Sequence, residues 1–228
     1  PMEKWEACKS NFKPEDLKGR VCYGGLDLSS TTDITAFVLV FPPTEEDDNY
    51  YILPYFWIPE ENMETRVNKD HVPYDVWQRK GYIETTEGNV IHYGFIERFI
   101  EELGKVYNIK EIAFDRWGAV QMTQDLDNMG FTVIPFGQGF SSMSPPTKEL
   151  MNLVLGKNIK HNGNPVLHWM MDNVCVRTDP AGNIKMDKAK STEKIDGAVA
   201  LVMALDRAIR NNKNDGESVY DKRGLLFI

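Results

Sequence analysis

The sequence predicts an α/β protein built on a mixed sheet of five or more strands, with helices on both faces. Three observations lead to this fold class. Three apolar segments rich in β-forming residues follow one another closely near the start. Strand and helix patterns then alternate through the middle of the chain. A long and almost wholly apolar helix pattern comes near the end, as is typical of a helix buried against a sheet.

The first three strands are expected to form an antiparallel meander. Residues 21–28, VCYGGLDL, are a compact apolar run, which is typical of a buried strand. Residues 34–41, ITAFVLVF, are rich in β-branched and aromatic residues and stop at Pro42 and Pro43. Residues 50–57 form the third apolar run. The connections are too short for a crossover, so neighbouring strands must run in opposite directions.

The middle of the chain has the pattern of parallel αβ units. Residues 60–80 and 94–107 place apolar residues at helical spacing. Residues 111–115, EIAFD, are expected to be a short buried strand, and a helix follows that ends at Gly130. Residues 131–136 are expected to be the next strand. A strand, a helix and a second strand in this order predict a right-handed parallel crossover.

The last third of the chain is expected to form two helices separated by a hairpin. Ser144 and Pro145 resemble the N-cap and first position of a helix that ends at Gly156. Residues 174–186 have the pattern of a β-hairpin, and residues 195–210 that of a long buried helix. A meander followed by crossover units is the ribonuclease H-like layout.

The length and composition fit one domain. The 228 residues can form a full core, and we expect a lead-in at residues 1–20, the domain at 21–210 and a polar tail at 211–228. No apolar run is long enough for a membrane span. The three cysteines, Cys8, Cys22 and Cys175, are far apart and form no CxxC pair. They argue against a disulfide framework or a zinc site and favour the cytoplasm.

The net charge of −8 argues against an extended DNA-binding surface. It allows a local basic stripe beside an acidic pocket. Such a stripe is found at four lysines that precede the last helix: Lys185, Lys188, Lys190 and Lys194. Acidic residues between them lower its net charge, so the alternatives are a solvated face and a track for the phosphate backbone.

Three aspartates are candidate metal ligands. Asp27 ends the first strand, Asp115 ends the strand 111–115, and Asp196 is in the first turn of the last helix. A lone buried carboxylate is unfavourable, and several together repel one another unless a cation neutralises them. Divalent Mg²⁺ or Mn²⁺ suits a set of oxygen ligands. Each aspartate alone also suits a capping or turn role, so the hypothesis depends on their convergence.

Five motifs together resemble a known family. In chain order they are GGLDLSSTTDITAFVLVFP, AFDRWGA, GQGFSSMSPPTKEL, HNGNPVLHWMMDN and KSTEKIDGAVALVMAL. They are similar to the carboxyl-terminal nuclease half of the large terminase subunit of tailed double-stranded DNA bacteriophages, over about residues 20–210. No GxxxxGK[ST] phosphate loop occurs in the sequence, so the family's ATPase half is not represented.

The resemblance implies a ribonuclease H-like endonuclease that hydrolyses concatemeric double-stranded DNA by a two-metal mechanism with Mg²⁺ or Mn²⁺. The family's metal-binding acids fall on Asp27, Asp115 and Asp196. The implied partners are DNA, an amino-terminal ATPase domain in the full chain, a terminase small subunit and a portal protein, with no membrane. The implied location is the cytoplasm of the infected host cell, with a transient stay at the procapsid portal.

Other residues have competing interpretations. Arg116 follows Asp115 directly and suits either a contact to the scissile phosphate or an ion pair with a site aspartate. Asp33 is a candidate fourth acid, although a turn role is favoured. His161 and His168 suggest a histidine-based nuclease only weakly, because no zinc-like pairing accompanies them, and packing or surface roles are favoured.

Two further functions compete with the nuclease. An actin-like or sugar-kinase-like ATPase shares the core and would use Asp27 with the following Ser29, Ser30 and Thr31 for phosphate, but it needs a duplicated core that this length does not provide. A non-catalytic module that docks on the portal or the small subunit would suit the acidic surface. The full set of three aspartates favours catalysis.

Overall fold

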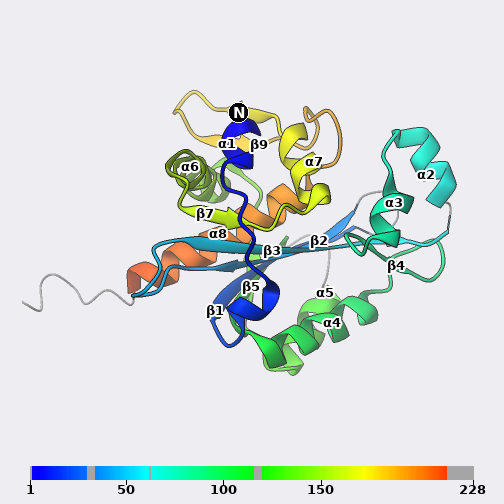
Figure 1. Ribbon diagram of the computed structural model, residues 1–228, viewed down its shortest axis with the longest axis horizontal. Helices are drawn as coiled ribbons and strands as arrows, with labels where there is room; N and C mark the ends of the chain where they lie inside the picture. The colour runs from blue at the N-terminus through cyan, green and yellow to red at the C-terminus, as the bar shows by residue number, and fades with distance from the viewer. Residues whose placement is uncertain (1, 30–33, 62, 116–119, 215–228) are drawn as a thin grey trace, which may run out of the picture.

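The protein is built around a seven-stranded mixed sheet (Figure 1). The computed structural model describes residues 2–29, 34–61, 63–115 and 120–214. The strand order is β4-β3-β2-β1-β5-β6, and β7 also pairs with β3. Five of its strands are longer than three residues: β1 (Val21–Asp27), β2 (Thr35–Phe41), β3 (Tyr50–Pro59), β5 (Asn108–Asp115) and β6 (Val133–Phe136). β1, β2 and β3 are antiparallel, whereas β5 is parallel to β1 and to β6. This is the predicted ribonuclease H-like layout.

Two short strands at the outer edge of β3 were not predicted. β4 (Glu84–Thr86) pairs with the end of β3, and β7 (Ile159–His161) pairs with its beginning. Each has only three residues, which is too few to show a period of two in the sequence. Their pairing therefore depends on tertiary contacts. They cover opposite ends of an otherwise open sheet edge.

Helices cover both faces of the sheet, as predicted. On one face α8 (Asp196–Asn214) crosses β1 and β2, with α6 (Phe140–Gly156) and α7 (Pro165–Asn173) packed against it. On the other face lie α4 (Tyr93–Val106) and α5 (Val120–Asn128) (Figure 1). None of the helices in the described residues is long and apolar enough to cross a membrane.

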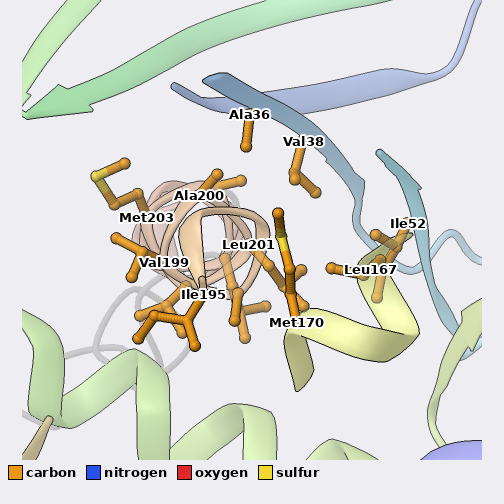
Figure 2. Packing of buried hydrophobic residues seen from close by; sticks show 14 of the residues in the cluster. Ala36, Val38, Ile52, Leu167, Met170, Ile195, Val199, Ala200, Leu201 and Met203 are labelled. Carbon is orange, nitrogen blue, oxygen red and sulfur yellow. The ribbon is translucent and has the colours of Figure 1, made fainter. Parts of the chain in front are cut away.

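The strand β2 shows why the first strands are apolar at every position. Ala36, Val38 and Val40 belong to the core beneath α8, and Phe37, Leu39 and Phe41 belong to the core beneath α4 and α5. Successive side chains of a strand point to opposite faces, so a strand buried on both sides needs a continuous apolar run. Figure 2 shows Ala36 and Val38 facing Ala200 and Leu201 of α8.

The helix α8 lies unusually close to β1. A Cβ atom at Gly25 would lie 2.0 Å from the carbonyl oxygen of Ala200 and 2.8 Å from the amide nitrogen of Ala204. At Gly197 a Cβ atom would lie 2.7 Å from the ring of Phe56. Gly25 in the strand and the small residues near the start of the helix therefore permit this close approach.

The start of α6 differs from the prediction. The helix begins at Phe140, with Gly139 as its N-cap, and contains the prolines that were expected to mark its first turn. Ser144 is buried, and its Oγ accepts a hydrogen bond from the amide of Ile184 at 3.1 Å. Ser144 therefore anchors the hairpin formed by β8 (Val176–Thr178) and β9 (Ile184–Met186) instead of capping a helix.

The region 60–80 forms two short helices instead of one. α2 spans Met63–Asp70 and α3 spans Tyr74–Arg79. Between them His71 has a positive φ of 54°, and Pro73 precedes α3. A left-handed residue followed by a proline ends the first helix and starts the second, which the helical spacing alone did not reveal.

The amino-terminal residues are packed on the domain, whereas the sequence suggested a lead-in over residues 1–20. They form α1 (Met2–Glu6) and the 3₁₀ helix η1 (Pro14–Leu17). Trp5, Cys8 and Leu17 are buried. The ring of Trp5 stacks on His161 with 4.2 Å between the ring centroids. These buried contacts tie the segment to β7. All three cysteines are free, as expected.

We expect Gly25→Ala to destabilise the domain strongly. The added methyl group would meet backbone atoms of α8, which cannot rotate away, so the helix must shift. The expected loss of unfolding free energy is about 3 kcal/mol, at the upper end of the usual range for overpacking. Urea denaturation followed by circular dichroism measures it. The matched control is Gly94→Ala in α4, where the nearest atom is 4.0 Å away and the substitution should be neutral or stabilising. Equal effects at both positions would contradict the close approach.

Candidate active site

Three elements bring the predicted aspartates together. Asp27 ends β1 and Asp115 ends β5, and these parallel strands are neighbours in register, with Leu26 beside Phe114. Both aspartates point to the face that α8 covers, because they lie two residues after Gly25 and Ala113 respectively. Asp196 begins α8 on the same face. The carboxyl ends of parallel strands are where ligand sites of α/β sheets gather.

Lys188 lies between two of these carboxylates. Its Nζ is 2.6 Å from Oδ2 of Asp27 and 2.9 Å from Oδ1 of Asp196. The two carboxylate oxygens therefore lie no farther apart than the sum of these distances. Asp27 and Asp196 are each only 3% exposed, whereas the side chain of Lys188 is 41% exposed. The cluster thus consists of two buried carboxylates and the ammonium of Lys188, whose side chain reaches them from the surface.

The pKa values reflect this crowding of charge. Burial raises the pKa of Asp27 to about 7. Lys188 acts against this rise, while the negative charges of Asp196 and Asp115 add to it. Burial lowers the pKa of Lys188, but the two carboxylates more than compensate and raise it above its usual value. Asp27 therefore depends on a positive charge beside it to remain ionised near neutral pH.

The residues fit a divalent cation. Oδ2 of Asp196 is buried and has no hydrogen-bond partner in the described part of the protein. All three candidate ligands supply oxygen, which Mg²⁺ and Mn²⁺ prefer. Among the described residues no group of three or more Asp, Glu, His or Cys side chains is placed so that it could hold a metal ion by itself. Magnesium sites seldom need one, because one or two carboxylates together with water and substrate phosphates usually complete the coordination.

The loop between β9 and α8 holds Lys188 in place. Oδ1 of Asp187 accepts the amide of Ala189 at 3.0 Å. Oγ of Ser191 donates to the carbonyl of Asp187 at 2.7 Å and accepts the amide of Cys175 at 3.1 Å. These hydrogen bonds join the loop to Cys175, which directly precedes the first strand of the hairpin. For Lys188 and the neighbouring lysines the sequence left a solvated face and a phosphate track as alternatives, whereas in the structure the ammonium of Lys188 contacts Asp27 and Asp196.

The other basic residues lie around the hairpin or outside the described chain. Nζ of Lys185 is 3.5 Å from the carbonyl of Gln138 and 5.4 Å from the ring centroid of Phe140. Lys190 is exposed and Lys194 is partly exposed. Arg116, and also the candidate fourth acid Asp33, lie outside the residues that the structure describes.

The two histidines have packing and surface roles. His161 is buried, with Nε2 2.9 Å from the carbonyl oxygen of Trp5, while Nδ1 accepts the amide of Gly163 at 3.1 Å. This pattern fixes a neutral ring, and burial lowers its pKa. His168 pairs with Glu6 at 2.7 Å. Both belong to the contacts of the amino-terminal segment, away from the three aspartates.

The chain matches the family model described as the terminase large subunit, endonuclease domain, over residues 2–212. It is 40% identical over 192 residues to the terminase large subunit of Enterobacteria phage HK97, which covers 83% of this chain and 38% of that relative. The crystal structure of the HK97 large terminase superposes with a TM-score of 0.82 at 36% identity, covering 91% of this chain and 43% of that one. This chain therefore spans less than half the length of that relative.

The fold extends to a more distant nuclease. The large terminase nuclease from thermophilic phage G20c, solved with bound magnesium, gives a TM-score of 0.54 at 14% identity. The match covers 87% of this chain and 85% of that one. At this identity the similarity shows a shared fold.

We expect Ser191→Ala to loosen the loop that carries Lys188. The change removes one hydroxyl that bonds both Cys175 and Asp187, so it should cost about 1 kcal/mol. Hydrogen exchange of the Cys175 amide should accelerate by about fivefold to tenfold, in line with that energy. Thr192→Ala is the control, because its hydroxyl makes only an exposed bond to Asn173. Unchanged exchange at Cys175 would show that the bracing does not exist in solution.

Proposed function

The chain belongs to the family of terminase large subunit endonuclease domains, and from this premise we propose that it is a divalent-metal-dependent endonuclease acting on double-stranded DNA. The observation that carries the proposal is the convergence of Asp27, Asp115 and Asp196 at one end of the sheet, where a buried oxygen of Asp196 has no hydrogen-bond partner within the described ranges. A buried acidic cluster of this kind is costly unless a cation neutralises it.

The three aspartates would hold Mg²⁺ or Mn²⁺, and two ions suit the reaction. The G20c nuclease, which shares the fold, was solved with bound magnesium and supports this choice. Such ions, when bound, lower the pKa of an attacking water and stabilise the leaving 3′-oxygen. The protein's own part is to fix the carboxylates on two strands and a helix, which are rigid elements, and to keep Asp27 and Asp196 shielded from bulk water.

Basic residues beside the site would contact the DNA backbone. Lys185, Lys190 and Lys194 come from the hairpin and the loop that follows it, and Arg116 directly follows Asp115 in the sequence. Phosphate contacts of this kind position a duplex without reading its sequence. We therefore propose that the hairpin side of the domain directs the phosphodiester bond toward the aspartates.

We propose the family's setting for the whole protein. The substrate would be concatemeric DNA during genome packaging. The full chain would carry an amino-terminal ATPase domain and would work with a terminase small subunit and a portal protein in the cytoplasm of the infected cell. A single core without a duplicated phosphate-binding hairpin in the described residues speaks against the actin-like ATPase alternative.

We expect Asp196→Asn to abolish DNA cleavage while leaving the fold intact. Asparagine keeps the size of the side chain but loses the negative charge that would hold a cation. Losing the negative charge from the first turn of α8 should reduce the stability of the domain by only about 0.3–1 kcal/mol of helix-dipole interaction. Nicking and linearisation of supercoiled plasmid with Mn²⁺ should fall at least about 100-fold, a loss of the size seen when one catalytic charge-stabilising group is removed.

The control for this experiment is Asp172→Asn, an exposed aspartate on α7, which should cut at the wild-type rate. Circular dichroism establishes that both variants are folded. A folded Asp196→Asn protein that cuts at the rate of the control would remove Asp196 from the reaction. A nucleotide-binding measurement would then decide whether the ATPase alternative needs to be reconsidered.

We expect Lys190→Ala to weaken DNA binding in a salt-dependent manner. If Lys190 neutralises one phosphate, its removal should reduce the slope of log affinity against log salt concentration by about one unit. Fluorescence anisotropy of a labelled duplex at several salt concentrations measures this slope. Lys110→Ala is the control, because Lys110 is exposed near the start of β5, at the opposite end of the strand from Asp115. A slope equal to that of the control would identify Lys190 as a solvated residue.

A further inference from the structure

The ammonium of Lys188 occupies the position that a cation bridging two of the acids would take. It lies within hydrogen-bond distance of one oxygen of Asp27 and one oxygen of Asp196. Asp27 and Asp196 would hold a Mg²⁺ or Mn²⁺ ion through the carboxylate oxygens that such ions prefer. Two cations at such close range repel one another strongly in a buried site. The bridging ion and the ammonium therefore exclude one another.

We propose that Lys188 is an internal counter-ion that competes with divalent metal for Asp27 and Asp196, so that metal loading requires its side chain to leave the cluster. The proposal rests on the proposed function of the same site. It concerns a step before the reaction, namely the replacement of the Lys188 ammonium by a divalent ion. It assigns Lys188 a role in controlling metal affinity in addition to any contact with DNA.

The exposure of the three side chains supports such an exchange. The side chains of Asp27 and Asp196 are 4% and 5% exposed, whereas that of Lys188 is 41% exposed. The carboxylates are fixed on β1 and α8, but the ammonium is carried by a flexible four-carbon chain from a loop. Lys188 can therefore rotate toward solvent without moving the acids.

The backbone contacts explain why the exchange does not require unfolding. The bonds from Ser191 and Asp187 hold the main chain of the loop and do not involve the lysine side chain. The second oxygen of Asp196, which is buried and has no hydrogen-bond partner among the residues that the structure describes, gives an incoming ion a ligand that Lys188 does not use. Once displaced, the ammonium is free to pair with a DNA phosphate, which is one of the two roles that the sequence left open for Lys188.

The direct test is the affinity for Mn²⁺ without DNA. Isothermal titration calorimetry would compare the wild type with Lys188→Met, which keeps most of the length of the side chain but removes its charge. We expect Lys188→Met to bind Mn²⁺ at least tenfold more tightly, because the ion no longer has to displace an ammonium. Lys188→Arg should stay close to the wild type, and Lys190→Met, which removes an exposed charge from the same loop, should change the affinity less than twofold.

Thermal unfolding provides a readout that a merely structural lysine would not change. Without metal, Lys188→Met should melt at a lower temperature than the wild type, because the acids lose their counter-ion. When Mn²⁺ is added at the same saturating concentration, the melting temperature should rise more in Lys188→Met than in the wild type. The reason is that a lower dissociation constant for Mn²⁺ gives a larger stabilisation of the folded state. A lysine needed only for packing would lower the melting temperature equally with and without metal.

The outcomes separate this inference from the proposed function. If the wild type binds Mn²⁺ and cuts DNA but Lys188→Met binds the metal with equal or lower affinity, the competition is disproved and the nuclease proposal stands. If the wild type and all variants fail to bind Mn²⁺ and the wild type does not cut DNA, both proposals are overturned. Tighter binding in Lys188→Met alone, with a larger thermal shift, supports the competition.

Discussion

The close contact between α8 and β1 is the constraint on which the site depends. Gly25 lets the backbone of the helix approach the strand to a distance that no side chain would permit. As a result the first turn of α8 lies over the carboxyl end of β1, and Asp196 reaches Lys188 together with Asp27. A displaced helix would separate the acids even though every one of them remained in the sequence. The packing of small residues between α8 and β1 thus sets the distance between Asp27 and Asp196.

The acidic cluster then requires charge compensation that the fold itself provides. Buried carboxylates without a cation would raise one another's pKa and destabilise the folded state. Lys188 supplies one positive charge from a loop whose backbone is braced by Ser191 and Asp187. The proposed counter-ion role of Lys188 implies that the domain folds without metal, in contrast to small zinc domains whose folding is coupled to metal binding. A replaceable internal cation is consistent with a site that must remain intact before it is loaded.

The sequence predicted those parts of the molecule that have a strong local signal. The meander, the crossover, the hairpin, α8 and the positions of Asp27, Asp115 and Asp196 on their elements all follow from apolar periodicity and turn residues. β4 and β7 have only three residues each and depend on the edge of β3. Ser144 resembled a helix cap but binds the hairpin. The position of Lys188 was not predictable, because no local pattern tells which way a loop lysine points.

The distribution of charge resolves the conflict between an acidic chain and a nucleic-acid substrate. The chain has a net charge of −8, so at long range it repels DNA. Near the site, however, the hairpin and the following loop carry Arg177, Lys185, Lys188, Lys190 and Lys194. Salt screens distant charges more than close ones, since the Debye length is about 8 Å at physiological ionic strength. Under the proposed function, the local basic residues would govern how a duplex meets the hairpin, while the overall acidity would disfavour binding elsewhere on the domain. Under the proposed function, this arrangement favours DNA that is already delivered to the site over DNA captured from solution, as suits the endonuclease domain of a terminase large subunit.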